Sequence, residues 1–156
     1  MIKAYKYRLN PNEEQRIFFE KSFGCARYVY NWGLNLRNEA YQKDGTRIGW
    51  VDICKRLTEL KKQEETSWLN EVANQSLQSS IRNMDSAFTR FFREKKGFPK
   101  FKSKKGKQSF QLVQNVSINF DNHKVKLPKI GWVNFYKNRE FNGRIGTVTI
   151  SKPPTG

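Results

Sequence analysis

The chain has 156 residues, 37% of them hydrophobic, which is enough for one core of ordinary size or for two small cores that share an interface. Thirty Lys and Arg against fourteen Asp and Glu give a formal net charge of +16, and this charge repels itself unless a polyanion neutralises it. Because no stretch approaches about eighteen apolar residues and no signal pattern follows Met1, the sequence excludes a membrane-spanning chain and predicts a soluble, intracellular protein that binds nucleic acid and no membrane.

The N-terminal segment predicts a β-strand followed by a helix. Apolar and basic residues alternate from Ala4 to Leu9, which places Tyr5 and Tyr7 on one face of a strand. The strand is expected to stop at Asn10. The run Asn10-Pro11-Asn12-Glu13 then resembles a helix start, because Asn accepts hydrogen bonds from free amides, Pro suits the first helical position and Glu can bond back to the cap. A helix is expected over about 11–22.

Three further helices are predicted after Gly24, which is expected to break the first one. The second spans about 25–42 and the third about 52–62. The fourth has the clearest apolar periodicity, with spacings of four and three that form a complete seam for packing against other helices. The seam consists of Leu77, Ile81, Met84, Phe88 and Phe91.

Residues 95–107 predict a basic connector, and the remainder of the chain predicts β-structure. The connector has seven lysines, two glycines, a proline and no acid, a composition that disfavours a regular helix. Beyond it, β-rich segments alternate with turn residues such as Asn142-Gly143, so we expect a small antiparallel sheet or barrel. If the N-terminal strand pairs into it, the helical part is an insertion between the first strand and the others.

No catalytic or metal site is expected. The acidic residues lie mostly beside Lys or Arg, as Glu59 does near Lys61 and Lys62, and do not form the carboxylate cluster that metal-assisted nuclease chemistry needs. His123, the single histidine, lies in a predicted turn and is expected to be an exposed loop residue. Cys25 and Cys54 have no CxxC spacing, so we interpret both as reduced packing residues.

A polar stripe on the fourth helix suggests contact with DNA. Gln75, Gln78 and Arg82 share one side of the helix, with Asn74 at its border, and amide and guanidinium groups can form paired hydrogen bonds with base edges. The alternative, a solvated polar face, stays open. The connector is interpreted as a phosphate-binding segment rather than a flexible linker, because its lysines are interleaved with Phe98 and Phe101. Trp50 is left as a core or a stacking residue, and Trp132 is predicted to be core.

Several motifs together resemble the N-terminal half of the TnpB family, also called OrfB. In chain order they are YRLNP at 7–11, Gly24 with ARYVYN at 26–31, EETSWL at 64–69, the helix with Gln78 and Phe88, GFPKFK at 97–102 and KLPKIGWV at 126–133. The family comprises transposon-encoded RNA-guided DNA nucleases related to type V CRISPR effectors. The resemblance covers essentially the whole chain.

The resemblance implies an α+β fold in which a wedge-like β-barrel carries an inserted, mostly antiparallel helical recognition lobe with helix-turn-helix character. Residues 1–10 would be the first barrel strand, 11–94 the lobe, 95–107 the connector and 108–156 the rest of the barrel. Such proteins hold a guide RNA and recognise a short transposon-adjacent motif in double-stranded DNA. A prokaryotic, nucleoid-associated cytoplasmic protein is therefore expected.

The resemblance also implies two sets of site residues. The surface that recognises the DNA motif would comprise Trp50, Cys54, Asn74, Gln75, Gln78, Gln114 and Asn115. Contacts to RNA and phosphate would come from Lys3, Lys6, Arg8, Arg27, Arg82, Lys95, Lys96, Lys100, Lys102, Lys104, Lys105 and Lys107.

The chain departs from the family pattern where it ends, at TVTISKPPTG. Family nucleases continue into a RuvC-like domain whose carboxylates hold Mg²⁺, with a zinc-ribbon-like insert, so we expect no cofactor, no cleavage by this chain alone and a barrel that is truncated. Two alternatives stay open. The chain could be one piece of a split nuclease completed by a partner chain, or a stand-alone DNA-binding regulator in which Gly24 marks the turn of a helix-turn-helix.

Overall fold

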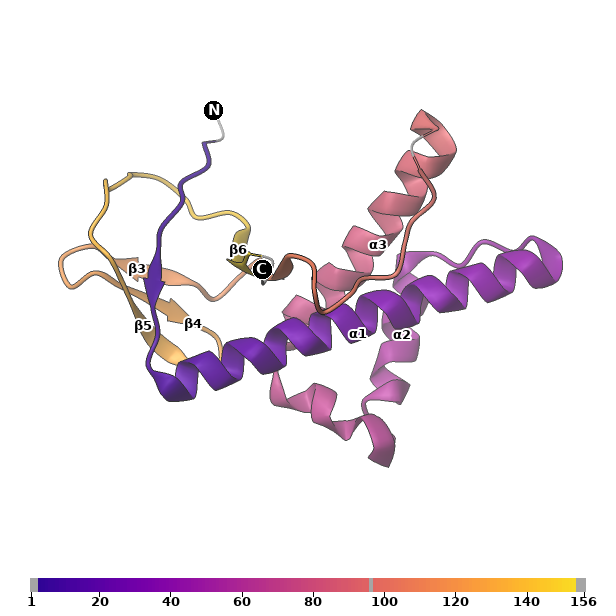
Figure 1. The fold of residues 1–156 in the computed structure, drawn as a ribbon, viewed down its shortest axis with the longest axis horizontal. Coiled ribbons are helices and arrows are strands. Elements are labelled where there is room, and N and C mark those ends of the chain that lie inside the picture. Colours follow the sequence, from indigo (N-terminus) through magenta and orange to yellow (C-terminus); the bar gives the residue numbers. More distant parts are fainter. Residues whose placement is uncertain (1–2, 96, 154–156) are drawn as a thin grey trace.

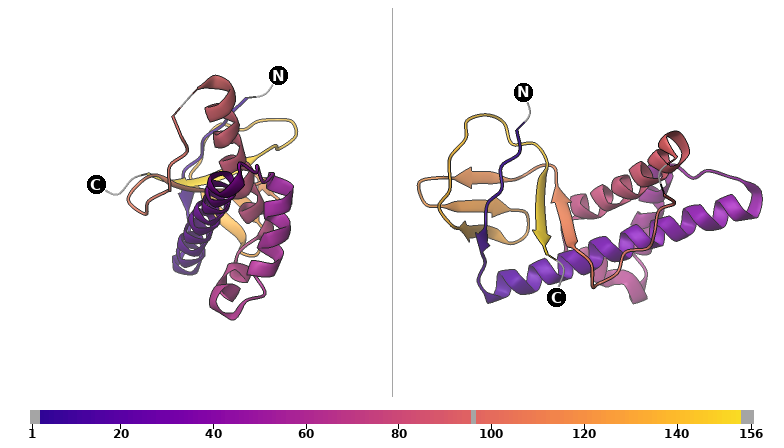
Figure 2. Two further views of the ribbon diagram at one scale, coloured as in Figure 1. Left: turned by 90° about the vertical axis from the view of Figure 1, so that its right-hand side faces the viewer. Right: turned by 45° about the horizontal axis from the view of Figure 1, so that its top comes forward.

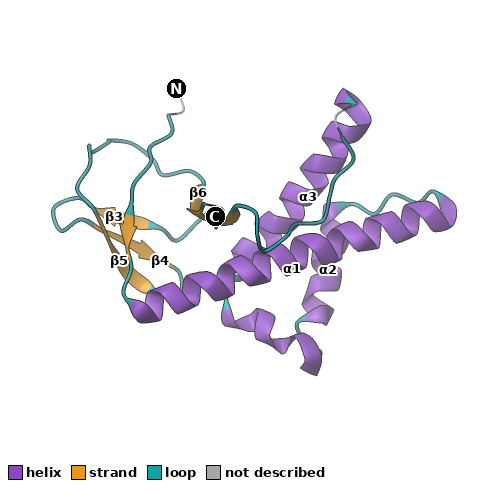
Figure 3. Cartoon of the chain, in the orientation of Figure 1, coloured by secondary structure: helices purple, strands orange, loops and turns teal. Residues whose placement is uncertain are grey.

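The fold places small sheets at one end and helices at the other. The computed structural model describes residues 3–95 and 97–153. Figure 1 shows the helix α1 running from beneath the sheets into the helical end, and Figure 3 shows the separation of strands from helices. The predicted α+β class is confirmed.

Helix α1 (Glu13–Asp44) begins with a capping box. The Asn12 side chain accepts a hydrogen bond from the Gln15 N–H (2.8 Å), and the Gln15 side chain accepts one from the Asn12 N–H (2.9 Å). The expected cap at Asn10 is two residues too early. Glu13 also lies three residues after Asn10, but Asn10 is held in the ladder between β1 and β5, so the reciprocal pair forms between Asn12 and Gln15. The helix ends at Gly45, whose φ of 74° suits the left-handed C-cap.

The predicted break at Gly24 is wrong, because α1 continues through it. A glycine inside a helix costs only about 1 kcal/mol relative to alanine, and packing on both sides outweighs that cost. Phe19 and Phe23 before the glycine are buried against the sheets, whereas Val29 and Leu34 after it are buried among the helices. The helix therefore connects two hydrophobic cores.

Three shorter elements complete the helical core. They are α2 (Trp50–Leu60), the 3₁₀ helix η1 (Glu64–Glu71) and α3 (Asn74–Glu94). The apolar seam predicted for the fourth helix lies on α3 and is buried from Leu77 to Phe88, while Phe91 is half-buried. The 3₁₀ helix lacks regular apolar periodicity and was not predicted.

The strands form two antiparallel sheets. Sheet order in the larger one is β1 (Leu9–Asn10), β5 (Gly131–Phe135), β4 (Lys124–Leu127) and β3 (Ser117–Asn119). The smaller one pairs β2 (Gln108–Leu112) with β6 (Val148–Lys152), as Figure 2 shows in its right-hand view. The predicted pairing of the N-terminal strand into the sheet is confirmed by the β1–β5 ladder. Over the described residues no ladder joins the two sheets into a closed barrel.

Trp132 is not a core residue as predicted, since 45% of its surface is exposed. Strand β5 buries Val133 and Phe135 on its inner face, and the period of two then turns Trp132 outward. His123 is half-buried rather than exposed. It adopts a φ of 51° in the β3–β4 turn, and its ring lies 6.0 Å from that of Phe135. In the described part of the chain, no helix is long and apolar enough to cross a membrane.

Candidate nucleic-acid interface

The connector is held against the helices rather than hanging free. The Asn31 side chain donates to the Lys102 carbonyl (3.0 Å) and accepts from the Lys102 N–H (2.7 Å). Near the other end of the segment, the Phe98 ring packs edge-on against Phe88 and Phe91 of α3, with centroids 5.5 and 5.0 Å apart. Phe98 is thus partly occupied by packing. By contrast, 56% of Phe101 is exposed.

Among the residues that the structure describes, the connector lysines have no acidic partners. No ion pair within the described ranges involves residue 95 or any of residues 97–107. The ammonium of Lys102 lies 4.4 Å from the centre of the Tyr30 ring, within the range of a cation–π contact. Burial lowers the pKa of this lysine. Lys96, one of the predicted phosphate contacts, lies outside the described residues.

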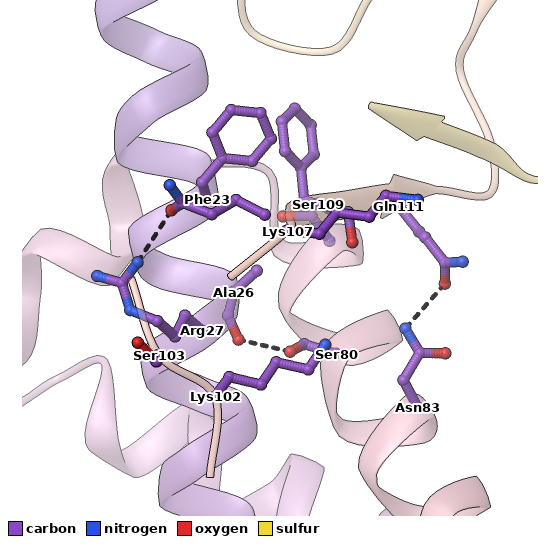
Figure 4. A pocket seen from close by; sticks show the side chains of 13 residues that line it. Phe23, Ala26, Arg27, Ser80, Asn83, Lys102, Ser103, Lys107, Ser109 and Gln111 are labelled. Atoms are coloured by element: carbon purple, nitrogen blue, oxygen red, sulfur yellow. Dashed lines mark hydrogen bonds between the residues drawn. The ribbon is translucent and has the colours of Figure 1, made fainter. Parts of the chain in front are cut away.

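A small hollow separates the connector from α1, α3 and β2 (Figure 4). Hydrogen bonds connect the residues that line it. Arg27 Nη1 donates to Gln108 Oε1 (3.0 Å), and Asn83 Nδ2 donates to Gln111 Oε1 (3.1 Å). Its volume of about 30 Å³ has room for ordered water but not for a nucleotide. Arg27, a predicted phosphate contact, is therefore partly used in joining α1 to β2.

Gln75 joins the start of α3 to the end of β2. Its Oε1 accepts hydrogen bonds from the N–H groups of Val113 (2.7 Å) and Gln114 (3.0 Å), and its Nε2 donates to the Gln114 carbonyl (3.0 Å). All three bonds use the amide group that was expected to contact a base. They also place Gln114 and Asn115 beside the first turn of α3, where Asn115 turns the chain with a φ of 63°.

The neighbouring members of the predicted motif surface form a second group. The Arg82 guanidinium lies 4.5 Å from the centre of the Trp50 ring, so α2 and α3 meet through this stack. Cys54 lies close enough for Arg82 to lower its pKa, although burial has the larger effect and raises it. Gln78, one turn before Arg82, is exposed and makes no hydrogen bond to another described side chain.

Asn74 is tied to a lysine that sequence reasoning did not single out. Lys61 Nζ donates to Asn74 Oδ1 (2.7 Å), while Lys129 Nζ donates to the Asn70 carbonyl (3.1 Å). Partial burial lowers the pKa of Lys61, and the positive charge of Lys129 lowers it further. These lysines lie 68 positions apart in the sequence, so no local pattern could have paired them.

We define the amide face as Asn74, Gln75, Gln78 and Arg82 of α3 together with Trp50, Cys54, Gln114 and Asn115. The remaining predicted phosphate contacts lie elsewhere. Lys3, Lys6 and Arg8 are exposed on the N-terminal segment at the sheet end, away from the connector in Figure 1. The structure therefore arranges the amide face as two groups joined through α3, and it separates the N-terminal basic residues from the connector.

Sequence reasoning also missed an aromatic pair. The rings of Tyr28 on α1 and Trp68 on η1 lie 5.0 Å apart and nearly perpendicular, and 37% and 39% of these residues are exposed. With Gly24, Arg27, Asn31 and Trp32 they line an open hollow of about 510 Å³, which we call the aromatic hollow. The hollow forms where α1 contacts η1, and its two aromatic residues, Tyr28 and Trp68, lie forty positions apart in the sequence.

The described residues do not fit a catalytic metal ion. No three His, Cys, Asp or Glu side chains among them lie close enough to share a metal. Both cysteines are free thiols, and burial raises the pKa of Cys25 to about 11. The Mg²⁺ and Zn²⁺ implied by the resemblance therefore have no ligand set in this part of the chain.

Comparison with known proteins decides the family. The helix-turn-helix domain described for OrfB proteins matches residues 1–46. InsQ of Escherichia coli (strain K12), described as a "Putative RNA-guided DNA endonuclease", is 30% identical over 151 residues, which are 97% of this chain and 38% of InsQ. The chain belongs to the OrfB/TnpB family. It corresponds to the N-terminal part of such proteins, and it spans about a third of the length of the endonuclease relatives it matches.

Two further relatives of this OrfB/TnpB chain differ greatly in the share of their length that is matched. A Streptomyces pristinaespiralis protein with the same endonuclease description is 34% identical over 127 residues, or 32% of its length. The virulence protein VsdF of Salmonella dublin is 31% identical over 116 residues, which are 98% of its length. In this OrfB/TnpB chain the region matched by the helix-turn-helix domain holds β1 and the uninterrupted helix α1, so the turn expected at Gly24 is absent from it.

Proposed function

We propose that this chain is the nucleic-acid-binding part of a transposon-encoded, RNA-guided DNA nuclease. It binds the guide RNA scaffold and recognises a short transposon-adjacent motif in double-stranded DNA. The observation that carries the proposal is the amide face, in which α3 contacts α2 through the Arg82–Trp50 stack and the segment after β2 through Gln75. Relatives described as RNA-guided DNA endonucleases support it.

The two sets of residues would have different tasks. The connector lysines, with Lys3, Lys6, Arg8 and Arg27, would neutralise phosphates of RNA and DNA without regard to sequence. Gln78 and Asn115 would contact base edges, because their amide groups are exposed. Gln75 would act indirectly, by holding Gln114 and Asn115 in position, and Trp50 would orient Arg82 toward the DNA.

Cleavage would come from outside this chain. A RuvC-like domain with its Mg²⁺ and a zinc-ribbon-like insert would be supplied by further residues of a longer protein or by a partner chain. Further strands would close the two sheets into the wedge barrel, with residues 11–94 as the inserted recognition lobe. The complex would act at the nucleoid, in the cytoplasm of a prokaryotic cell.

A second candidate function is a stand-alone nucleic-acid-binding regulator without nuclease activity. It is favoured by VsdF, nearly all of whose length is matched by this chain. Such a regulator would use the same surfaces but bind DNA without RNA.

Purification of the chain followed by sequencing of the bound RNA separates the two candidates. The first predicts one discrete RNA species and loss of selective duplex binding after RNase treatment. Unchanged duplex binding after RNase would contradict the RNA-guided proposal and support the regulator. Co-purification of a chain with three metal-binding acids would identify a split nuclease.

A further inference from the structure

We infer that the aromatic hollow binds an unpaired nucleobase of a single-stranded segment by stacking. This inference rests on the proposed function, since it names the part of the nucleic acid that this surface contacts. None of the predicted sites includes Tyr28, Trp32 or Trp68.

The size and lining of the hollow suit a flat aromatic ligand. Its volume of about 510 Å³ lies within the range of about 300–1,000 Å³ typical of ligand pockets. Tyr28 and Trp68 meet edge to face with an interplanar angle of 73°, and both rings line the hollow. Both are more than a third exposed, although aromatic side chains normally gain most by burial.

The polar groups of the hollow favour stacking over recognition of a particular base. The Trp68 indole N–H donates to the Glu65 carbonyl (3.0 Å), and the Asn31 amide is used on both sides by Lys102. Few groups are thus left to distinguish one base edge from another. Stacking alone tolerates all four bases, because each has a π-face.

The surrounding charge favours a nucleotide over an apolar ligand or an acid-poor peptide. Arg27 reaches the hollow through Nη2, which lies 3.8 Å from the position that a Cβ at Gly24 would occupy. Asn31 lines the hollow and also fixes the connector at Lys102, so the lysines pass alongside. A base in the hollow would therefore have its phosphates near a run of cations.

The space beside Gly24 allows a side chain to obstruct the hollow without disturbing the fold. An added Cβ meets nothing nearer than 3.8 Å, which is ordinary van der Waals contact. Because Leu is also a better helix former than Gly, Gly24→Leu should project into the hollow, obstruct it beside Arg27 and leave thermal stability unchanged or higher.

The test measures binding of the full chain to a fluorescent oligoadenylate RNA of about ten nucleotides, to the DNA of the same sequence, and to an abasic strand of equal charge. Wild type should bind the RNA about tenfold more tightly than the abasic strand. Trp68→Ala and Gly24→Leu should each remove most of that preference while leaving abasic binding unchanged, and Trp68→Phe should retain much of it. The matched control is Trp132→Ala, which truncates a similarly exposed tryptophan on β5 and should leave binding to both strands unchanged.

Stacking has its own optical readout. 2-Aminopurine placed in the oligonucleotide should be quenched on binding to wild type and to Trp132→Ala, but not to Trp68→Ala. Equal affinity of wild type for the base-bearing and abasic strands would overturn the hollow while leaving phosphate binding intact. Failure to bind either strand would overturn the proposed function as well. Equal preference for RNA and DNA would assign the hollow to any single strand, and a preference for RNA would assign it to the guide.

Discussion

The connector and the amide face of α3 differ in what their side chains already bond to. The described connector lysines have no carboxylate partner, so their charge is available to phosphates. On the amide face, Gln75 is engaged by three hydrogen bonds and Asn74 by one, and only part of the polar set stays exposed. Periodicity identifies a face of a helix, but tertiary contacts decide which of its amides are free.

The largest expected effect comes from removing charge from the connector. Replacing Lys100, Lys104, Lys105 and Lys107 with Ala should weaken duplex binding by about 100-fold or more at about 0.1 M salt and reduce the slope of log K against log salt by about 3 to 4. The loss should be uniform across sequences, because phosphate contacts carry no base information. Titrations at several salt concentrations measure both quantities. The control replaces four exposed lysines outside the connector, namely Lys43, Lys62, Lys124 and Lys137. An equal loss of binding in this control would contradict a local role for the connector.

Gln78 and Gln75 should separate base contact from positioning. Gln78→Ala should lower the free energy of unfolding by no more than about 0.5 kcal/mol, since its side chain is exposed, yet weaken binding to the preferred motif by about 1–3 kcal/mol. Gln75→Ala should lower the free energy of unfolding by about 1–2 kcal/mol, because it removes the partners of two backbone N–H groups and one carbonyl. Urea unfolding and duplex titration on each variant decide the matter. If both variants lose the same amount of stability and of duplex affinity, the distinction between base contact and positioning is wrong.

The Arg82–Trp50 stack should contribute a smaller amount. Arg82→Lys keeps the charge but loses the planar group above the indole ring, so stability should fall by about 0.5–1 kcal/mol with the salt slope unchanged. Thermal unfolding measures the first and salt titration the second. If Arg82→Lys lowers the stability of wild type but causes no further loss in the Trp50→Ala variant, the two residues stabilise the chain through the stack.

The smallest effect concerns the pH dependence at Lys61. Its pKa in the folded chain is lowered by burial and by Lys129, so folding disfavours the charged form. The unfavourable contribution is present at neutral pH and is relieved as the pH rises from the folded pKa toward the usual value of 10.5. Compared with Lys61→Met, wild type should therefore gain stability as the pH rises toward 10.5. A difference that stays flat or falls with pH would contradict the lowered pKa.

Local sequence predicted the elements better than their connections. The buried seam of α3 follows from the helical period and agrees with the structure. The strand predicted from Ala4 is largely wrong, because the regular strand is confined to Leu9–Asn10, although Tyr5, Tyr7 and Leu9 are half-buried in alternation as the period of two predicts. The predicted break at Gly24 was wrong because glycine is a frequent helix end, whereas here packing in two cores keeps the helix continuous. Trp132 misled because an apolar run does not tell which face of a strand turns inward until its pairing is known.

The candidate site likewise has one part that local sequence predicts and another part that it does not. The stripe of Gln75, Gln78 and Arg82 was accessible from helical spacing alone. The clamp from Gln75 to residues 113–114, the Lys61–Asn74 bond and the aromatic hollow depend on contacts between segments far apart in sequence. No periodicity within one segment encodes them.

Selection from a duplex library with a randomised motif, applied in parallel to wild type, Gln78→Ala and the connector variant, tests the central claim most directly. If phosphate binding and motif recognition lie on separate surfaces, the connector variant should keep the base preferences of wild type at lower overall affinity. Gln78→Ala should instead lose preference at one or two positions of the motif. Altered preferences in the connector variant, together with unaltered ones in Gln78→Ala, would contradict it.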